Sequence, residues 1–146
     1  MNETILRFGY PATLIEEYEH WLVLLRPGQP TLGSLILAAK AEATSFAGLP
    51  PEAFSELQRA VSDLERALAD AVRYEKINYL MLMMVDPHVH FHVIPRYAGE
   101  RSACGVTVAD EGWPKVPALS EAVELTPDET QALVACLRGS WPGSEA

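Results

Sequence analysis

The sequence has few cysteines, and these do not form a recognisable pattern. Only Cys104 and Cys136 occur, far apart and in neither a C-x-x-C nor a zinc-ribbon spacing. This spacing predicts neither a disulfide framework nor a cysteine metal site. A reducing cytoplasm is the compartment that such cysteine usage favours.

Long apolar runs are also missing. The longest, from Tyr79 to Val85, is too short to cross a bilayer. The N-terminal residues Met1 to Thr4 lack the basic start and apolar stretch of a secretory signal. We therefore expect a soluble, unprocessed, cytoplasmic protein.

Basic residues are outnumbered, with 11 lysines and arginines against 20 aspartates and glutamates. The resulting net charge of −9 disfavours binding to nucleic-acid polymers and to anionic membranes. A phosphate-bearing ligand must therefore be attracted locally. The 146 residues are 49% hydrophobic, which is enough for a single domain, 1–146, with its own core.

Strand and helix patterns follow one another in the first two thirds of the chain. Two apolar strands, Trp21 to Leu25 and Leu35 to Leu37, are separated by a turn rich in proline and glycine. Apolar residues at three-and-four spacing then predict a long amphipathic helix from Pro51 to Arg73. The run Ile77 to Val85 predicts a strand buried on both faces, with its methionines filling the core.

The next strand, His88 to Ile94, alternates histidines with apolar residues. Alternate side chains of a strand point to opposite faces, so three imidazoles share one face and the apolar residues face the core. Pro95 is expected to end this strand by removing a backbone donor.

The C-terminal third, 98–146, is expected to be a loop-rich extension of the core at 21–97. A short strand is predicted near Val106 to Val108. Thr126 followed by Glu129 predicts a capping box, and Gly139 is expected to close the short helix that follows. Together the patterns predict an α+β fold, with a mainly antiparallel five-stranded sheet, one long helix and a C-terminal helix.

His88, His90 and His92 carry the chemistry that the sequence suggests. Their side chains are expected to stand in line, about 7 Å apart from the strand rise. Imidazole can be a nucleophile through one nitrogen while the other holds a hydrogen bond, and it donates to anions once protonated. The middle ring is therefore expected to attack phosphorus, while its neighbours bind phosphoryl oxygens or protonate the leaving group.

The segment His88-Val89-His90-Phe91-His92-Val93-Ile94 resembles the signature of the histidine triad (HIT) superfamily, in which histidines alternate with apolar residues. Through Pro95-Arg96 it is most similar to the fragile-histidine-triad and bacterial HIT branches. The resemblance covers roughly 21–97, and members of these branches hydrolyse or transfer nucleotides at the α-phosphate.

The resemblance implies that His90 is the nucleophile and that His88 and His92 contact the phosphate and the leaving-group side. It also implies a nucleotide or nucleotide conjugate as substrate, a homodimer that joins its sheets, and no metal or other cofactor.

The chain departs from the family pattern around this motif. Many members carry a glycine-rich loop with an amide and a hydroxyl residue before the histidines, where this chain has Val85-Asp86-Pro87. Ser34 falls where a histidine is common, and Arg26 falls where a ribose-binding Asn or Asp is expected. Both are candidate substrate contacts. Arg96 is a third, because its planar fork can pair with phosphate.

Other interpretations of the same residues stay open at this stage. A nucleotide-binding module without catalysis would share the histidine strand. A zinc hydrolase could use two of the histidines with a further ligand, although three residues in a line do not converge easily on one ion. A polar strand face exposed to solvent is the structural alternative. Trp113 and Trp141 could cover a ligand or a partner, but aromatic residues in such segments are more often packing anchors.

Overall fold

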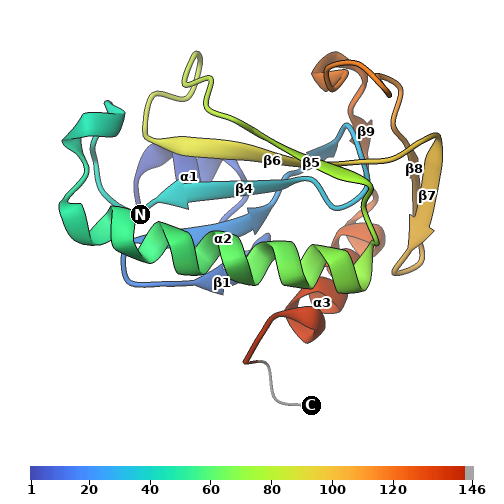
Figure 1. The fold of residues 1–146 in the computed structure, drawn as a ribbon, viewed down its shortest axis with the longest axis horizontal. Coiled ribbons are helices and arrows are strands. Elements are labelled where there is room, and N and C mark those ends of the chain that lie inside the picture. Colours follow the sequence, from blue (N-terminus) through green and yellow to red (C-terminus); the bar gives the residue numbers. More distant parts are fainter. Residues whose placement is uncertain (144–146) are drawn as a thin grey trace.

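The computed structural model describes residues 1–143, which form a five-stranded antiparallel sheet with helices on both faces (Figure 1). The sheet has the order β1-β2-β4-β6-β5, and all of its neighbouring strands are antiparallel. This confirms the predicted α+β fold. The five strands are β1 (Leu14–Glu17), β2 (Trp21–Leu25), β4 (Leu35–Ala39), β5 (Lys76–Leu80) and β6 (His90–Arg96).

The hairpin of β2 and β4 forms the centre of the sheet, as its two apolar runs predict. Both strands are buried along their whole length. Trp21, Val23 and Leu25 belong to one core cluster, whereas Leu22 and Leu24 belong to a second one. Because alternate residues point to opposite faces, the sheet is covered on both sides.

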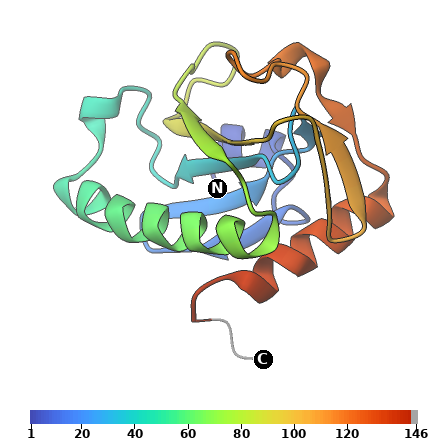
Figure 2. The same cartoon turned by 45° about the vertical axis from the view of Figure 1, so that its right-hand side comes forward.

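Two helices cover one face of the sheet, and a short helix covers the other (Figures 1 and 2). Helix α2 (Pro51–Ala71) agrees with the predicted amphipathic helix and packs against α3 (Pro127–Ser140). The capping box of α3 is present, with Thr126 and Glu129 bonding to each other's backbone amides. Gly139 lies inside this helix, so the prediction that it ends the helix was wrong.

The two strands around the histidines differ from their predicted bounds. Strand β5 ends at Leu80, and the residues that follow lie largely in solvent, with Met84 84% and Val85 81% exposed. The apolar run is therefore neither one long strand nor buried on both faces. Strand β6 begins at His90 and continues through Pro95 to Arg96. Pro95 is tolerated there although it was expected to end the strand.

The C-terminal third is more regular than its glycines and prolines suggest. A hairpin of β7 (Glu100–Ala103) and β8 (Val106–Ala109) contains the predicted short strand. A second small sheet pairs β3 (Gly28–Gln29) with β9 (Val123–Glu124). This pairing fastens the C-terminal segment to the turn after β2. The 3-10 helices η1 (Phe46–Gly48) and η2 (Leu119–Glu121) complete the elements.

Cys104 and Cys136 form a disulfide in the structure, although their spacing predicted no disulfide framework. The turn between β7 and β8 places Cys104 against α3, where Cys136 lies. Their spacing of 32 residues gave no pairing signal, because the contact depends on how the hairpin and α3 pack. The disulfide therefore ties the hairpin to the C-terminal helix.

None of the helices within 1–143 is both long enough and apolar enough to cross a membrane.

Candidate active site

Helix α1 (Glu3–Arg7), which the sequence reasoning did not foresee, covers the sheet face that carries the histidines. Asn2 caps it, accepting a hydrogen bond from the Ile5 amide at 3.0 Å. The Asn2 amide group also donates to the carbonyl oxygens of Ala39 and Ala41, both at 3.0 Å. The helix is thereby fixed to the end of β4. Asn2 is a typical N-cap residue and could have signalled this helix. A helix of five residues, however, is too short to show the periodic apolar pattern from which helices are predicted.

His90 and His92 lie ring to ring on this face. Their ring centroids are 5.2 Å apart, closer than the predicted spacing. The register pairs Ala38 with His90 and Ile36 with His92, so the rings share the face of the smaller core cluster. Val89 and Val93 are buried in the larger cluster with α2. The predicted division of this strand into a histidine face and a core face is therefore confirmed for His90 and His92.

The protonation of His90 follows from one hydrogen bond. Its Nδ1 lies 2.7 Å from the backbone carbonyl oxygen of His88. A carbonyl oxygen only accepts, so Nδ1 carries the proton and donates it. In the neutral ring, Nε2 therefore keeps its lone pair. A fixed ring with a free Nε2 is what a nucleophilic imidazole requires.

His88 precedes β6 and occupies a different environment. Its Nδ1 lies 2.8 Å from the hydroxyl of Thr4 on α1, and its Nε2 lies 3.5 Å from a carboxylate oxygen of Glu42. The expected straight row of three rings is therefore incorrect, because His88 lies outside the regular strand. A proton on Nε2 of His88 lies beside the Glu42 carboxylate, so His88 is placed to donate a proton at the edge of the site.

Arg26 reaches His92 across the sheet, although the two residues are 66 positions apart. The Nε–H of Arg26 donates to Nδ1 of His92 at 3.3 Å, which leaves the imidazole proton on Nε2. The guanidinium also donates to the carbonyl oxygen of Gly28 at 2.6 Å. Arg26, predicted as a substrate contact, therefore lies within the histidine cluster.

Burial, together with the charges of Arg26 and His90, lowers the pKa of His92 from 6.5 to about 4, while the charge of Asp86 opposes the change. His92 is therefore neutral at pH 7. Unfolding returns its pKa to the ordinary value, so between pH 4 and 6.5 the unfolded chain binds a proton that the folded chain does not. The contribution of His92 to the free energy of unfolding should therefore decrease as the pH drops from 6.5 to 4.

Substitution Arg26→Gln should raise the pKa of His92 above its wild-type value of about 4. The variant loses a nearby positive charge and admits water to the ring, and both changes favour the imidazolium. An NMR titration of the His92 ring protons measures the shift. An unchanged pKa in the variant, or a wild-type pKa already near 6.5, would show that this environment is described wrongly.

The histidine rings are covered by Phe8, which follows α1. Its ring centroid is 5.5 Å from that of His90 and 6.0 Å from that of His92. His90 is only 2% exposed and His92 8%. The middle ring, which was expected to attack phosphorus, is therefore closed off in this conformation. The cover comes from the N-terminal segment, which packs on the sheet from outside.

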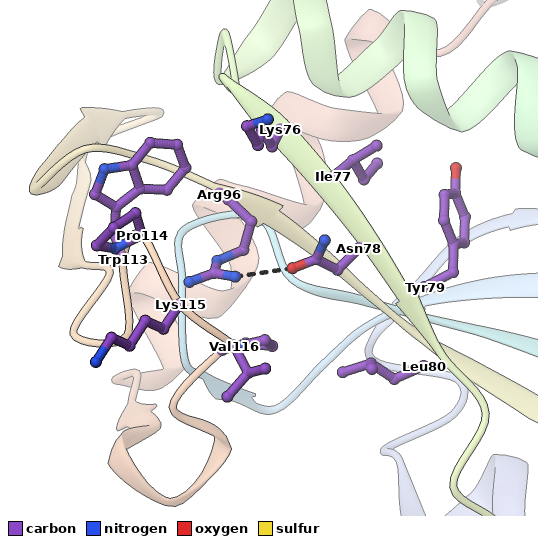
Figure 3. A pocket seen from close by; sticks show the side chains of 11 residues that line it. Lys76, Ile77, Asn78, Tyr79, Leu80, Arg96, Trp113, Pro114, Lys115 and Val116 are labelled. Atoms are coloured by element: carbon purple, nitrogen blue, oxygen red, sulfur yellow. Dashed lines mark hydrogen bonds between the residues drawn. The ribbon is translucent and has the colours of Figure 1, made fainter.

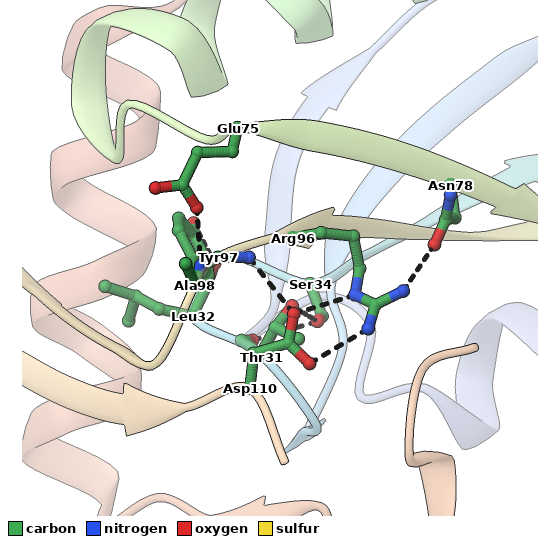
Figure 4. Close-up of polar contacts among 9 residues, drawn as sticks. All are labelled: Thr31, Leu32, Ser34, Glu75, Asn78, Arg96, Tyr97, Ala98 and Asp110. Atoms are coloured by element: carbon green, nitrogen blue, oxygen red, sulfur yellow. Dashed lines mark hydrogen bonds and ion pairs between the residues drawn. The ribbon is translucent and has the colours of Figure 1, made fainter. Parts of the chain in front are cut away.

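Ser34 and Arg96 are engaged within the protein (Figure 4). Ser34 is fully buried, and its hydroxyl lies 2.9 Å from that of Thr31, so its assignment as a substrate contact is corrected. Arg96 is 3% exposed and donates to both carboxylate oxygens of Asp110, at 2.8 and 3.1 Å. A third bond, 2.8 Å long, joins it to Asn78. The fork that was expected to bind phosphate is thus already occupied.

Sequence reasoning missed Thr4, Phe8 and Asp110, each of which contacts a predicted site residue.

Within 1–143, no three His, Cys, Asp or Glu side chains are grouped so that they could hold a metal ion.

Comparison with known proteins agrees with this architecture. The family model of the HIT domain matches residues 10–99. A histidine triad protein from Marinobacter aquaeolei VT8 is 22% identical, with a TM-score of 0.75 over 99% of this chain and 97% of that one. A histidine triad protein from Bradyrhizobium japonicum is 20% identical, with a TM-score of 0.72 over 97% of this chain and 96% of that one. A zinc-bound histidine triad family protein from Mycobacterium smegmatis is 21% identical, with a TM-score of 0.59 over 91% of this chain and 88% of that one.

No match was found among curated proteins. At these identities the structural likenesses show a shared fold. The family itself follows from the HIT-domain match, which spans more than half of the sequence and includes all three motif histidines. The chain belongs to the HIT family.

Proposed function

We propose that the protein hydrolyses or transfers nucleotides at an α-phosphate through a covalent intermediate on His90. The observation that carries the proposal is the bond from Nδ1 of His90 to the carbonyl oxygen of His88, because it leaves the Nε2 lone pair free. The flanking imidazoles then need only to stabilise charge and move protons. The alternation of histidines in the sequence supports the same assignment.

The proposed reaction has two displacements. In the first, Nε2 of His90 forms a bond to phosphorus while the bond from phosphorus to the leaving group breaks. The leaving group departs with that electron pair and takes the Nε2 proton of His88 in its imidazolium form, whose Nδ1–H the Thr4 hydroxyl accepts and which lies beside Glu42. In the second, the oxygen of water or another acceptor attacks phosphorus and restores the free ring. The proton released by the acceptor returns to His88.

His92 contributes as a neutral hydrogen-bond donor. Arg26 occupies its Nδ1, so its Nε2–H is available for a phosphoryl oxygen. The positive charge of Arg26 lies directly behind this ring. We therefore assign both residues to stabilising the charge that builds up on the phosphoryl oxygens. Arg96 instead fixes the end of β6 through Asp110.

Access to phosphorus requires the Phe8 ring to move from His90 and His92. Phe8 is only half-buried and lies in the N-terminal segment, so its displacement leaves the sheet unchanged. A planar base could take the place of this ring against the apolar surface. The site is thereby closed to water until a ligand of suitable shape enters.

We also propose that the active protein is a homodimer. Strand β5 is at the edge of the sheet, and the neighbouring part of α2 exposes apolar side chains such as Phe54, which is 39% exposed. A cavity of about 520 Å³ there is lined by Leu57 and Val61 as well. A second copy would cover this surface. Sedimentation at the mass of one 16.0 kDa chain would exclude the assembly.

Incubation with a panel of nucleotides and nucleotide conjugates, followed by product analysis, tests the proposed function. Release of a nucleoside monophosphate, or its transfer to an acceptor, is expected, and chelators should have no effect. A raised melting temperature without any product would support a non-catalytic binding module instead. Loss of activity with chelators, together with zinc in the purified protein, would favour the zinc hydrolase.

A further inference from the structure

The disulfide between Cys104 and Cys136 lies where the tip of the β7–β8 hairpin meets α3 (Figure 2). Both cysteines are partly exposed. Gly105 follows the first of them, and a Cβ atom added to this glycine would meet no atom within 4 Å. On α3, the positions one turn before and one turn after Cys136 are Ala132 and Gly139, and both are exposed. A small reagent can therefore approach the disulfide while the protein stays folded.

Cys104 occupies a backbone position that does not suit its side chain. Ala103 pairs with Val106, so Cys104 and Gly105 form a two-residue turn. Their φ angles are 56° and 77°, in the left-handed region that the common hairpin turn requires at both positions. Glycine and asparagine adopt this region readily, whereas other residues rarely do. The conformation of the turn thus gives no reason for a cysteine at this position, but a bond to Cys136 does.

The disulfide is the only covalent or polar link between the hairpin and α3. Within 1–143, no hydrogen bond or ion pair joins residues 100–109 to residues 127–140. The base of the hairpin is attached elsewhere, since Arg101 donates to two backbone carbonyl oxygens just after α2, at 3.1 and 2.7 Å. Val106 and Val108 add apolar packing against the larger core cluster. Opening of the disulfide would therefore free the tip of the hairpin while its base stays attached.

Asp110, which follows β8, connects the hairpin to the strand that carries His90 and His92. Its carboxylate accepts hydrogen bonds from Arg96, at the end of β6, and from the next backbone amide, that of Tyr97 (Figure 4). Trp113 lies beside Arg96 in Figure 3, with its ring centroid 6.0 Å from the guanidinium carbon. The hairpin and the loop after it thus help to keep water from a buried ion pair at the end of this strand.

We propose that Cys104 and Cys136 form a reversible redox site, at which a dithiol reductant opens the disulfide of the folded protein and releases the tip of the hairpin from α3. One thiolate of the reductant attacks a cysteine sulfur and displaces the other, and the second thiol of the reductant then breaks the mixed disulfide. Two electrons and two protons pass to the cysteines, and the reductant becomes a disulfide. A disulfide reagent reverses these steps. The redox state thereby controls how firmly the hairpin is held.

Reduction should lower the melting temperature by about 10 °C, because a cross-link between residues 32 positions apart restricts the unfolded chain to about this extent in a protein of this size. The backbone amides of β7 and β8 should exchange hydrogen at least about tenfold faster in the reduced protein, since the tip can then separate from α3. Calorimetry and hydrogen-exchange mass spectrometry, each with and without dithiothreitol, measure the two effects.

The double variant Cys104→Ser with Cys136→Ser is the matched control, because the chain has no other cysteine. It should melt at the temperature of the reduced wild type, and dithiothreitol should not change this temperature further. If the serine variant does not fold, wild-type protein kept in dithiothreitol still provides the open form for the same comparison.

The order of reduction and unfolding separates a redox site from a purely structural disulfide. Dithiothreitol in native buffer should expose both thiols to iodoacetamide while the circular dichroism stays native, and glutathione disulfide should close the bond again. Reduction that occurs only at urea concentrations that unfold the protein would overturn the proposal. Equal melting temperatures and equal hairpin exchange in the two redox states, or thiols that no oxidant pairs, would do the same. None of these measurements depends on nucleotide turnover, so the proposed function is tested separately.

Discussion

Substitution His90→Asn should lower the turnover of any nucleotide substrate by at least about a thousandfold while the protein stays folded. Removal of a covalent nucleophile commonly costs this much or more, because the remaining groups cannot replace the bond it forms. Asparagine keeps a polar side chain, smaller than imidazole, at the buried position under Phe8. Steady-state kinetics and thermal unfolding of the same preparation measure the two effects.

The fourth histidine offers a matched control. His20 lies between β1 and β2, outside the cluster of histidine rings, with its ring near Glu19. His20→Asn makes the same chemical change and should leave turnover within about twofold, the range expected of a surface substitution away from the site. Comparable activity of His90→Asn and wild type would remove His90 from the mechanism.

Substitution Asp110→Ala should lower the free energy of unfolding by about 3 to 5 kcal/mol, the cost of removing one partner from a buried ion pair. Arg96 is almost fully buried, and Asp110 accepts two of its hydrogen bonds. The same carboxylate also accepts the Tyr97 amide at 3.0 Å. The variant would leave the charge of Arg96 buried without compensation. Equilibrium unfolding in urea measures the loss.

The double variant Arg96→Met with Asp110→Leu separates the charge from the packing. Replacing both partners by apolar residues removes the uncompensated charge, so much of the stability should return. A loss below about 1 kcal/mol for Asp110→Ala alone would mean that the pair is more solvated than its burial indicates.

Local patterns were sufficient to predict the parts of the fold in which neighbours in sequence cooperate. The apolar spacing of α2, the alternation of β6 and the capping box of α3 each involve residues that lie only two to four positions apart in the sequence. These patterns predicted the antiparallel sheet and the face on which His90 and His92 lie. The HIT resemblance depended on the same short stretch.

Other features depend on residues that meet only in the folded chain. The contacts of Thr4 with His88 and of Arg26 with His92 join distant segments and leave no periodic signal. The disulfide between Cys104 and Cys136 likewise needs the packing of a hairpin on α3. Strand β5 was predicted too long because an apolar run predicts burial, whereas the residues after Leu80 extend into solvent.

One local and one distant contact set the proton positions of the two buried imidazoles. The His88 carbonyl fixes the proton of His90 on Nδ1, and Arg26 fixes that of His92 on Nε2. One ring therefore presents a lone pair, and its neighbour presents a donor. Chemistry at phosphorus needs both kinds of group, and the backbone and Arg26 supply them from a repeated residue type.

Peptide mapping by mass spectrometry after a rapid alkaline quench of the reacting protein tests the role of His90 most directly. With a nucleotide substrate in turnover, a nucleotidyl group should be found on His90, and His90→Asn protein should carry none. A nucleotidyl group on His88 or His92 instead, or steady turnover with His90 unmodified at every time point, would contradict the assignment.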